Sequence, residues 1–132
     1  MKLEVPLLLL QFVYIANIFV CAWISSTCLF APATARTTIF ENTVAYSETI
    51  RLVGALWGAI FVLSVLGLFF PRQMALVLVF QLIYKSTWLL VVALPAQLNG
   101  EDFPRGMAMT FLIWVIGLPF VIPWRSIFAA NG

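Results

Sequence analysis

The sequence contains no histidine, and only 9% of its 132 residues are charged. Without histidine the chain lacks the most common metal ligand, the usual axial ligand of haem and any histidine-based acid–base catalysis. A soluble domain carries about 25% charged residues, so this shortage of charge excludes a water-exposed globular surface. Intrinsic disorder requires a polar composition and is excluded as well, because 64% of the residues are hydrophobic.

Several other chemical groups are also missing. The net charge is only +2, and no run of basic residues indicates a nucleic-acid partner. Cys21 and Cys28 lie two helical turns apart, about 10 Å along a helix, which is too far for a disulfide within that helix. We interpret both as packing residues. No nucleophile–base pair, phosphate-binding loop or metal-ligand cluster can be assembled, so the sequence predicts no catalytic residue, no metal site and no cofactor.

Long apolar segments dominate what is present, and the mean hydropathy is +1.08. A membrane-spanning helix needs about 20 apolar residues. Four segments meet this length approximately: residues 5–30, 50–70, 74–94 and 106–122. The first is too long for the hydrophobic region of a signal peptide, which has about 7–15 residues. The sequence therefore predicts an all-α, polytopic membrane protein, with residues 1–132 forming one transmembrane domain built as a four-helix bundle.

Local signals predict how the segments end and connect. Pro71 is expected to end the second helix and Pro95 the third, because proline lacks an N–H and disrupts a helix interior. The short connection between these helices makes them antiparallel neighbours. Thr38 and Glu41 have the spacing of a capping box, which predicts a short interfacial helix over about residues 39–46.

The distribution of basic residues gives little information on orientation. With four spans, both termini lie on one side, and each side carries three basic residues: Lys2, Arg72 and Arg125 on the terminal side, and Arg36, Arg51 and Arg105 on the other. The amino terminus and Arg72 favour a cytoplasmic location for both termini. We expect a bacterial inner membrane, which suits a compact helical chain without a cleavable signal.

Lys85 is the one ionisable residue near the middle of a predicted span. An ionisable group inside a bilayer is costly and by default marks a functional site. Gln81, Tyr84 and Trp88 share a helical face with Lys85. If this face is functional, it forms a pocket for an anionic or polar head group, or a proton-linked relay. If it is structural, Lys85 pairs with a carboxylate or carbonyl of a neighbouring helix and fixes the bundle.

The first predicted helix carries a second polar stripe. Its small and polar residues fall on one side: Gln11, Tyr14, Asn17, Cys21, Ser25 and Cys28. Such residues usually face other helices, where their hydrogen bonds contribute about 0.6 kcal/mol each. The alternative is that the stripe lines a cavity, with Gln11 and Asn17 as ligand-binding residues. We expect the Lys85 face to point toward this stripe.

The second predicted helix contains a GxxxG motif at Gly54 and Gly58, which permits close packing of helix backbones. The motif does not say whether its partner is the third predicted helix or another chain. Arg51 lies on the same face, at the mouth of this seam, and is a further candidate ligand-binding residue. Glu48, three residues earlier, is placed for a weak surface ion pair with Arg51.

The second predicted helix and the break that follows it contain a further pattern, formed by Arg51, Gly54, Trp57, Gly58, Gly67 and Pro71. With these residues this part of the chain resembles the DoxX-like family of small integral membrane proteins. In that family an arginine opens a glycine-rich second helix, and a Gly/Pro break leads into the third. The resemblance covers the second and third helices. It implies a four-helix bundle and, in places, an association with membrane oxidoreductases and quinone chemistry, but it supplies no catalytic motif.

Three classes of function stay open at this point. The composition favours a non-catalytic accessory or scaffold subunit of a membrane complex. The alternative is a binder or carrier of an amphipathic molecule, a lipid or a quinone, in a polar pocket around Lys85. A membrane-embedded enzyme has the least support, since histidine and intramembrane acids are absent. The expected partners are the lipid bilayer, other membrane subunits or a second copy of the chain.

Overall fold

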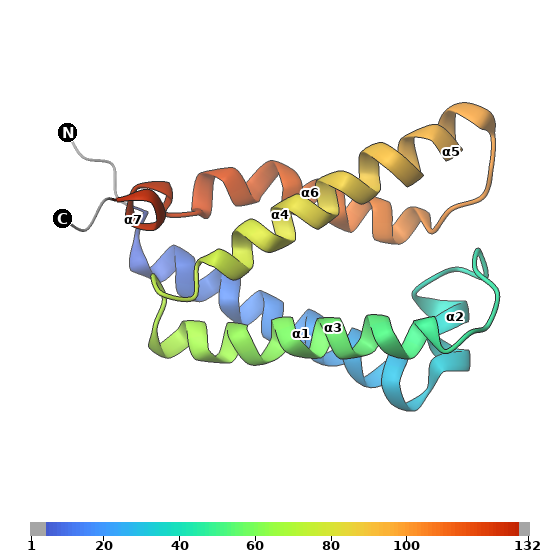
Figure 1. The fold of residues 1–132 in the computed structure, drawn as a ribbon, viewed down its shortest axis with the longest axis horizontal. Coiled ribbons are helices and arrows are strands. Elements are labelled where there is room, and N and C mark those ends of the chain that lie inside the picture. The colour runs from blue at the N-terminus through green and yellow to red at the C-terminus, as the bar shows by residue number, and fades with distance from the viewer. Residues whose placement is uncertain (1–4, 130–132) are drawn as a thin grey trace.

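A computed structural model of the chain describes residues 5–129, and all regular structure in that part is helical (Figure 1). The elements in chain order are α1 (Leu7–Phe30), α2 (Pro32–Thr38), α3 (Thr49–Phe69), α4 (Leu76–Trp88), the π-helix η1 (Leu89–Ala93), α5 (Leu94–Asn99), α6 (Arg105–Val121) and α7 (Trp124–Phe128). The α4, η1 and α5 segments form one continuous helix. This helix, α1 and α3 are each long and apolar enough to cross a membrane, and α6 is a shorter apolar helix. The prediction of a helical membrane protein is therefore confirmed.

The helices form two antiparallel pairs (Figure 1). One pair is α1 with α3, and the other is the continuous α4–η1–α5 helix with α6. The pairs converge at the end that carries α7 and the turn between α3 and α4. They separate toward the opposite end, where α2 and α5 lie (Figure 1). The space between the pairs at that wider end is where the site described below is found.

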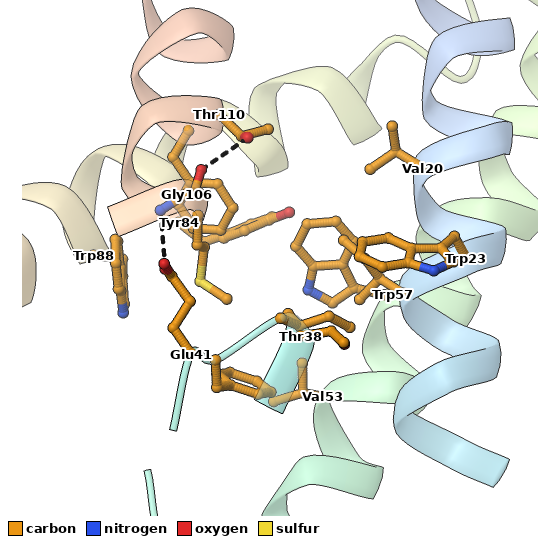
Figure 2. Close-up of a pocket in the computed structure, with 15 residues that line it drawn as sticks. Val20, Trp23, Thr38, Glu41, Val53, Trp57, Tyr84, Trp88, Gly106 and Thr110 are labelled. Carbon is orange, nitrogen blue, oxygen red and sulfur yellow. Dashed lines mark hydrogen bonds between the residues drawn. The ribbon is translucent and has the colours of Figure 1, made fainter. Parts of the chain in front are cut away.

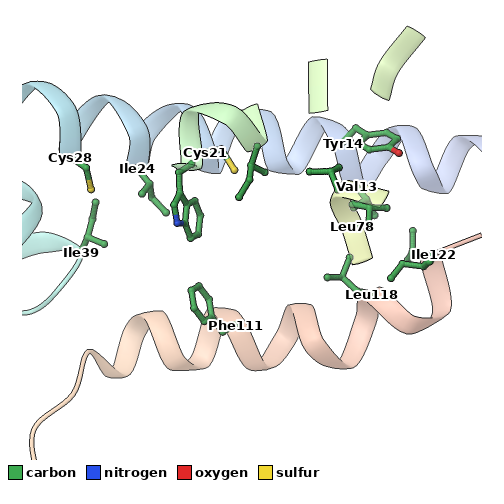
Figure 3. Close-up of a cluster of buried hydrophobic side chains, with 14 of the residues drawn as sticks. Val13, Tyr14, Cys21, Ile24, Cys28, Ile39, Leu78, Phe111, Leu118 and Ile122 are labelled. Atoms are coloured by element: carbon green, nitrogen blue, oxygen red, sulfur yellow. The ribbon is translucent and has the colours of Figure 1, made fainter. Parts of the chain in front are cut away.

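The hydrophobic core lies between the two pairs (Figure 3). Tyr14 and Cys21 come from α1, Leu78 from α4, and Phe111 and Leu118 from α6, and all five are buried. The Tyr14 hydroxyl also donates a hydrogen bond of 2.6 Å to a backbone carbonyl in the turn between α3 and α4. Tyr14 thus links the first pair to the turn that leads into the second.

The GxxxG motif packs α3 against α1 of the same chain, not against the third long helix. A Cβ atom added at Gly54 would lie 2.8 Å from Cys28 Cβ, and one added at Gly58 would lie 2.9 Å from Ser25 Oγ. The Ser25 hydroxyl also donates a hydrogen bond of 2.8 Å to the Gly54 carbonyl. The polar stripe of α1 supplies these partners, because its small side chains allow the two backbones to approach.

The prediction that Pro95 ends the third long helix is wrong, since this helix continues to Asn99. The π-helical turn η1 ends at Ala93, two residues before the proline, and the amide of its C-cap residue Leu94 bonds to the Leu89 carbonyl, five residues back. This widened turn accommodates the proline ring, which would clash with a carbonyl in a regular α-helix. The helix ends instead at Gly100, which adopts a left-handed conformation with φ of 70°.

The short connecting helix lies earlier than predicted: it is α2, and residues 39–46 form turns and loop. Pro32 occupies the first turn of α2, where its missing N–H costs nothing. The Thr38 hydroxyl does not cap a following helix, because it donates back to a carbonyl within α2 at 2.7 Å. Glu41 and Asn42 have φ angles of 51° and 58°, and these left-handed conformations prevent helix continuation.

Candidate functional site: an aromatic cavity beside a buried lysine

The polar face of α4 points into the molecule and meets the polar stripe of α1, as expected. Gln81 and Lys85 are only 1% and 2% exposed. The Asn17 side-chain amide donates to Gln81 Oε1 at 2.8 Å, and the Gln81 amide donates back to Asn17 Oδ1 at 3.2 Å. Because Asn17 belongs to α1 and Gln81 to α4, this contact joins the two helix pairs. Tyr84 and Trp88, on the same face of α4, are partly exposed.

The Lys85 ammonium group lies among four aromatic rings. Its Nζ is 4.8 to 5.5 Å from the ring centroids of Tyr84, Trp57, Phe111 and Trp114. It also donates a hydrogen bond of 3.0 Å to the Tyr84 hydroxyl. The negative faces of aromatic rings attract a cation, most strongly where water is excluded.

No carboxylate within residues 5–129 lies at ion-pair distance from Lys85, and its hydrogen bond goes to a hydroxyl. The carboxylate or carbonyl partner predicted for a purely structural Lys85 is thus replaced by ring faces and a phenol. Lys85 is a buried cation with aromatic rings from three helices around its ammonium group.

Phe111 contacts three other aromatic rings, those of Trp57, Tyr84 and Trp88. It stacks with Trp57 at a centroid distance of 6.1 Å and an angle of 17°, and it makes edge contacts with Tyr84 and Trp88 at 6.0 and 5.3 Å. The sequence analysis did not single out Phe111, because no polar neighbour or motif distinguishes it from the other phenylalanines. The four rings come from α3, α4 and α6, so this cluster connects three helices.

The rings of Trp57, Tyr84 and Phe111 form a layer in front of Lys85. A cavity of about 580 Å³ lies on the side of this ring layer that faces away from Lys85, between the two helix pairs (Figure 2). Its buried floor consists of aromatic and aliphatic side chains: Ile24, Ile39, Trp57 and Phe111. Its rim is exposed and includes two hydroxyls and a carboxylate, those of Thr38, Thr110 and Glu41. The site therefore combines an apolar interior with a polar edge.

Glu41 closes one side of this cavity. Its Oε2 accepts a hydrogen bond of 3.0 Å from the backbone N–H of Gly106, in the first turn of α6 (Figure 2). The first N–H groups of a helix have no intrahelical acceptor, and the helix dipole favours a negative charge there. The bond fastens the loop after α2 to α6 across the mouth of the cavity.

The structure brings some of the predicted site residues to the cavity and leaves others apart. Tyr84 and Trp88 line it, whereas Gln81, Lys85 and Asn17 lie behind the ring layer or along the contact between the helix pairs. Gln11 is nearly two turns before Asn17 and is not among the lining residues. Arg51 is exposed and pairs with Glu48 at 3.4 Å. The cavity is therefore an aromatic site beside Lys85, and Lys85 itself is not among its lining residues.

The fold and the cavity define a helical membrane protein with an open, aromatic-lined cavity between its helix pairs. In the part of the chain that the structure describes, no group of three or more His, Cys, Asp or Glu side chains is placed to hold a metal ion. No family model matches this chain, and neither a curated protein nor a solved structure shows significant similarity to it. The DoxX-like resemblance accordingly stays a prediction.

Proposed function

We propose that this chain is a four-span membrane bundle that binds an amphipathic small molecule, of the lipid or quinone type, in the cavity between its helix pairs. The observation that carries the proposal is the cavity itself, with its buried aromatic floor and its exposed polar rim. Small-molecule sites are typically concavities of about 300–1,000 Å³ with mostly apolar walls and a few polar groups, and the 580 Å³ cavity falls in this range.

The assignment of α6 as the fourth span rests on its length and its neighbours. Its 17 residues rise about 26 Å, a few ångströms less than the hydrocarbon core of a typical bilayer. Such a mismatch costs only fractions of a kcal/mol per ångström. Arg105 and Trp124 flank α6 at its two ends and suit the two membrane interfaces. Four spans also agree with the position of the start of α1 and of α7 at one end of the bundle (Figure 1).

We place that end in the cytoplasm and the protein in a bacterial inner membrane. Arg72 and Arg125 lie at this end, and within residues 5–129 it carries no acidic residue. Cysteine labelling in intact cells tests the orientation: Ser126→Cys should resist, and Ser47→Cys should accept, a reagent that does not cross membranes. The reverse labelling pattern would overturn this orientation.

The proposed ligand has an orientation in the cavity. Its apolar body would contact the floor, to which Trp57 and Phe111 contribute their rings, and one polar group would lie at the rim near the Thr110 hydroxyl. Lys85 lies behind the floor, about 5 Å from the ring centroids of Trp57 and Phe111. In an apolar environment its positive charge acts over several ångströms. An electronegative ligand atom that reaches the floor is therefore attracted toward Lys85.

The scaffold or accessory-subunit function has less support. One sequence feature that allowed a partner subunit was the GxxxG motif, which is used within this chain to pack α3 on α1. The motif is consequently not available for a partner subunit.

A pair of matched variants on α6 tests the binding function. Met107 lines the cavity, whereas Met109 is exposed on the outer surface of the same helix. The wild-type protein, purified in mild detergent, should retain a defined amphipathic compound that mass spectrometry of an organic extract identifies. Met107→Trp fills the cavity and should remove most of this compound, whereas Met109→Trp should retain it. Equal content in all three proteins, or none in the wild type, would overturn the proposal.

A further inference from the structure

Trp57 is a buried residue of the cavity floor whose polar group has no hydrogen-bond partner within residues 5–129. The side chain is only 9% exposed. Its contacts in the described part of the chain are with the rings of Tyr84 and Phe111 and with the Lys85 ammonium group, and none of these gives the indole N–H an acceptor. A buried tryptophan N–H usually has a hydrogen-bond partner, so this donor is an exception that needs an explanation.

The indole N–H of Trp57 is open to the cavity. Trp57 lines the cavity, and among the described residues the one fully enclosed side-chain polar atom without a partner is Ser64 Oγ, not Trp57 Nε1. Figure 2 shows the indole nitrogen on the edge of the ring that is turned toward the side of the cavity where Glu41 lies. A molecule in the cavity can therefore reach this donor.

The hydroxyl groups at the rim do not offer such a donor, because each already donates within its own helix. The Thr38 hydroxyl donates to the Thr34 carbonyl at 2.7 Å, and the Thr110 hydroxyl donates to the Gly106 carbonyl at 3.0 Å. These hydroxyl oxygens can accept a hydrogen bond from a ligand, but their protons are already used. The rim therefore suits a ligand group that donates, whereas Trp57 requires one that accepts.

The other polar aromatic residues of the cavity differ from Trp57 in their surroundings. Trp23 is exposed and Trp88 is partly exposed, so water or lipid head groups can accept from their indole N–H groups. The Tyr84 hydroxyl lies 3.0 Å from Lys85 Nζ, from which it accepts a hydrogen bond. Among the described lining residues, Trp57 is thus the buried indole that depends on a ligand for its acceptor.

We propose that the bound compound carries a carbonyl oxygen within its apolar body, and that this oxygen accepts a hydrogen bond from the Trp57 indole N–H. The inference rests on the proposed binding function and narrows its ligand to a carbonyl compound. Lys85 Nζ lies 5.2 Å from the Trp57 ring centroid, so its charge attracts the negative end of the carbonyl dipole. A carboxylate fits less well, because Lys85 does not line the cavity and a buried anion without a contacting cation is costly.

The depth of Trp57 distinguishes such a compound from an ordinary phospholipid. Arg51 is exposed in the first turn of α3 and suits the membrane surface. Trp57 follows it by six residues, about 9 Å along the helix. An acceptor beside Trp57 therefore lies within the hydrocarbon region of the bilayer, which is about 30 Å thick. Acyl chains carry no oxygen at this depth, so a phospholipid would leave the indole N–H without a partner.

The experiment measures the binding of benzophenone and diphenylmethane to the full chain in mild detergent by equilibrium dialysis, corrected for the partition of each probe into the detergent. The two probes differ only in having a carbonyl or a methylene group between two phenyl rings. The wild type should bind benzophenone at least about tenfold more tightly, which corresponds to about 1.4 kcal/mol. Trp57→Phe keeps an aromatic ring and removes the N–H, so this preference should fall to about twofold or less. Trp124→Phe removes an indole that does not line the cavity and should retain the full preference.

Equal binding of the two probes by the wild type, or a preference that survives in Trp57→Phe, would overturn the inference. Tighter binding of diphenylacetate than of benzophenone would overturn it as well, in favour of a carboxylate. If Trp57→Phe loses helicity by circular dichroism, benzothienylalanine at position 57 replaces it, because sulfur then takes the place of the N–H in a ring of nearly the same shape.

Met107→Trp separates this inference from the proposed function. If it abolishes the binding of both probes while the wild type shows no preference for benzophenone, the cavity binds ligands and only the carbonyl inference is wrong. If Met107→Trp leaves the binding of both probes unchanged, they do not occupy the cavity, and the proposed function fails together with the inference.

Discussion

Asn17 on α1 and Gln81 on α4 exchange two hydrogen bonds, with N···O distances of 2.8 and 3.2 Å. Both side chains are buried, and each amide gives the other one donor and one acceptor. This reciprocal pairing fixes the position of α4 along α1. Because Lys85 follows Gln81 by one helical turn, the same contact places the lysine behind the floor of the aromatic cavity.

Asn17→Ala and Gln81→Ala should each destabilise the protein. Each substitution leaves a buried amide without its partner, and this lowers the free energy of unfolding by about 1–3 kcal/mol. The double variant should cost less than the sum of the two, with a coupling of about 0.5–2 kcal/mol. Equilibrium unfolding in mixed micelles measures these values, with Gln11→Ala as the control. Strictly additive losses would contradict a direct interaction in the membrane.

Gly54→Ala should destabilise the pairing of α1 and α3. The added Cβ would lie 2.8 Å from Cys28 Cβ and 3.0 Å from the Leu29 backbone N, which cannot move aside without shifting the helix. Overpacking of this kind costs about 1–3 kcal/mol. Gly117→Ala is the matched control, because a Cβ there meets nothing within 4 Å, and it should gain about 0.5–1 kcal/mol from helix propensity. Equal melting temperatures for the two variants would contradict the predicted packing.

The sequence predicted the existence of the long apolar helices and the polar contact between α1 and α4, and the physical reason is clear. Length and apolarity indicate each long helix. On α1, the predicted polar stripe is buried from Tyr14 through Asn17 and Cys21 to Ser25 and Cys28. The amide and phenol groups of Asn17 and Tyr14 are best placed against other parts of the protein and not against lipid, so the stripe identifies the inner face.

The cavity was not predictable in the same way. Phe111 is 5% exposed and forms part of its floor, whereas Phe120 on the same helix is 79% exposed. Lipid and protein core are equally apolar, so the sequence does not distinguish an inward phenylalanine from an outward one. The π-helical turn before Pro95 is likewise a tertiary adjustment, and the local rule for proline predicted the opposite result.

Glu41→Ala should loosen the rim of the cavity. The variant loses the acceptor for the Gly106 N–H, and the removal of a helix N-terminal acceptor costs about 0.5–2 kcal/mol. Hydrogen exchange at the first turn of α6 should accelerate. Glu41→Gln, which keeps a side-chain oxygen, should restore most of the protection. Glu101→Ala removes an exposed acid from another loop and should have no effect on this turn; an equal acceleration there would contradict the specific role of Glu41.

The energetics of Lys85 depend on two opposing contributions. Transfer of an ammonium group from water into a protein interior costs several kcal/mol even after relaxation. Cation–π attraction returns about 2 kcal/mol when the site is desolvated, and the Tyr84 hydroxyl adds one hydrogen bond. Without a carboxylate partner in the described part of the chain, the desolvation cost of the ammonium group exceeds the stabilisation from the rings and the Tyr84 hydroxyl. We therefore expect that the charge of Lys85 does not stabilise the fold.

Lys85→Met should accordingly leave the melting temperature unchanged or raise it, since methionine keeps an unbranched apolar chain among the rings and removes only the charge. The same variant should lose the amphipathic compound that the wild type retains, because the positive charge behind Trp57 and Phe111 attracts an electronegative atom of that compound that reaches the floor, in addition to the polar group at the rim. Thermal unfolding and mass spectrometry of the organic extract are measured on one preparation. A loss of stability equivalent to about 1–3 kcal/mol would show instead that the lysine fixes the bundle. A stable variant with undiminished ligand would show that the cavity binds without its charge.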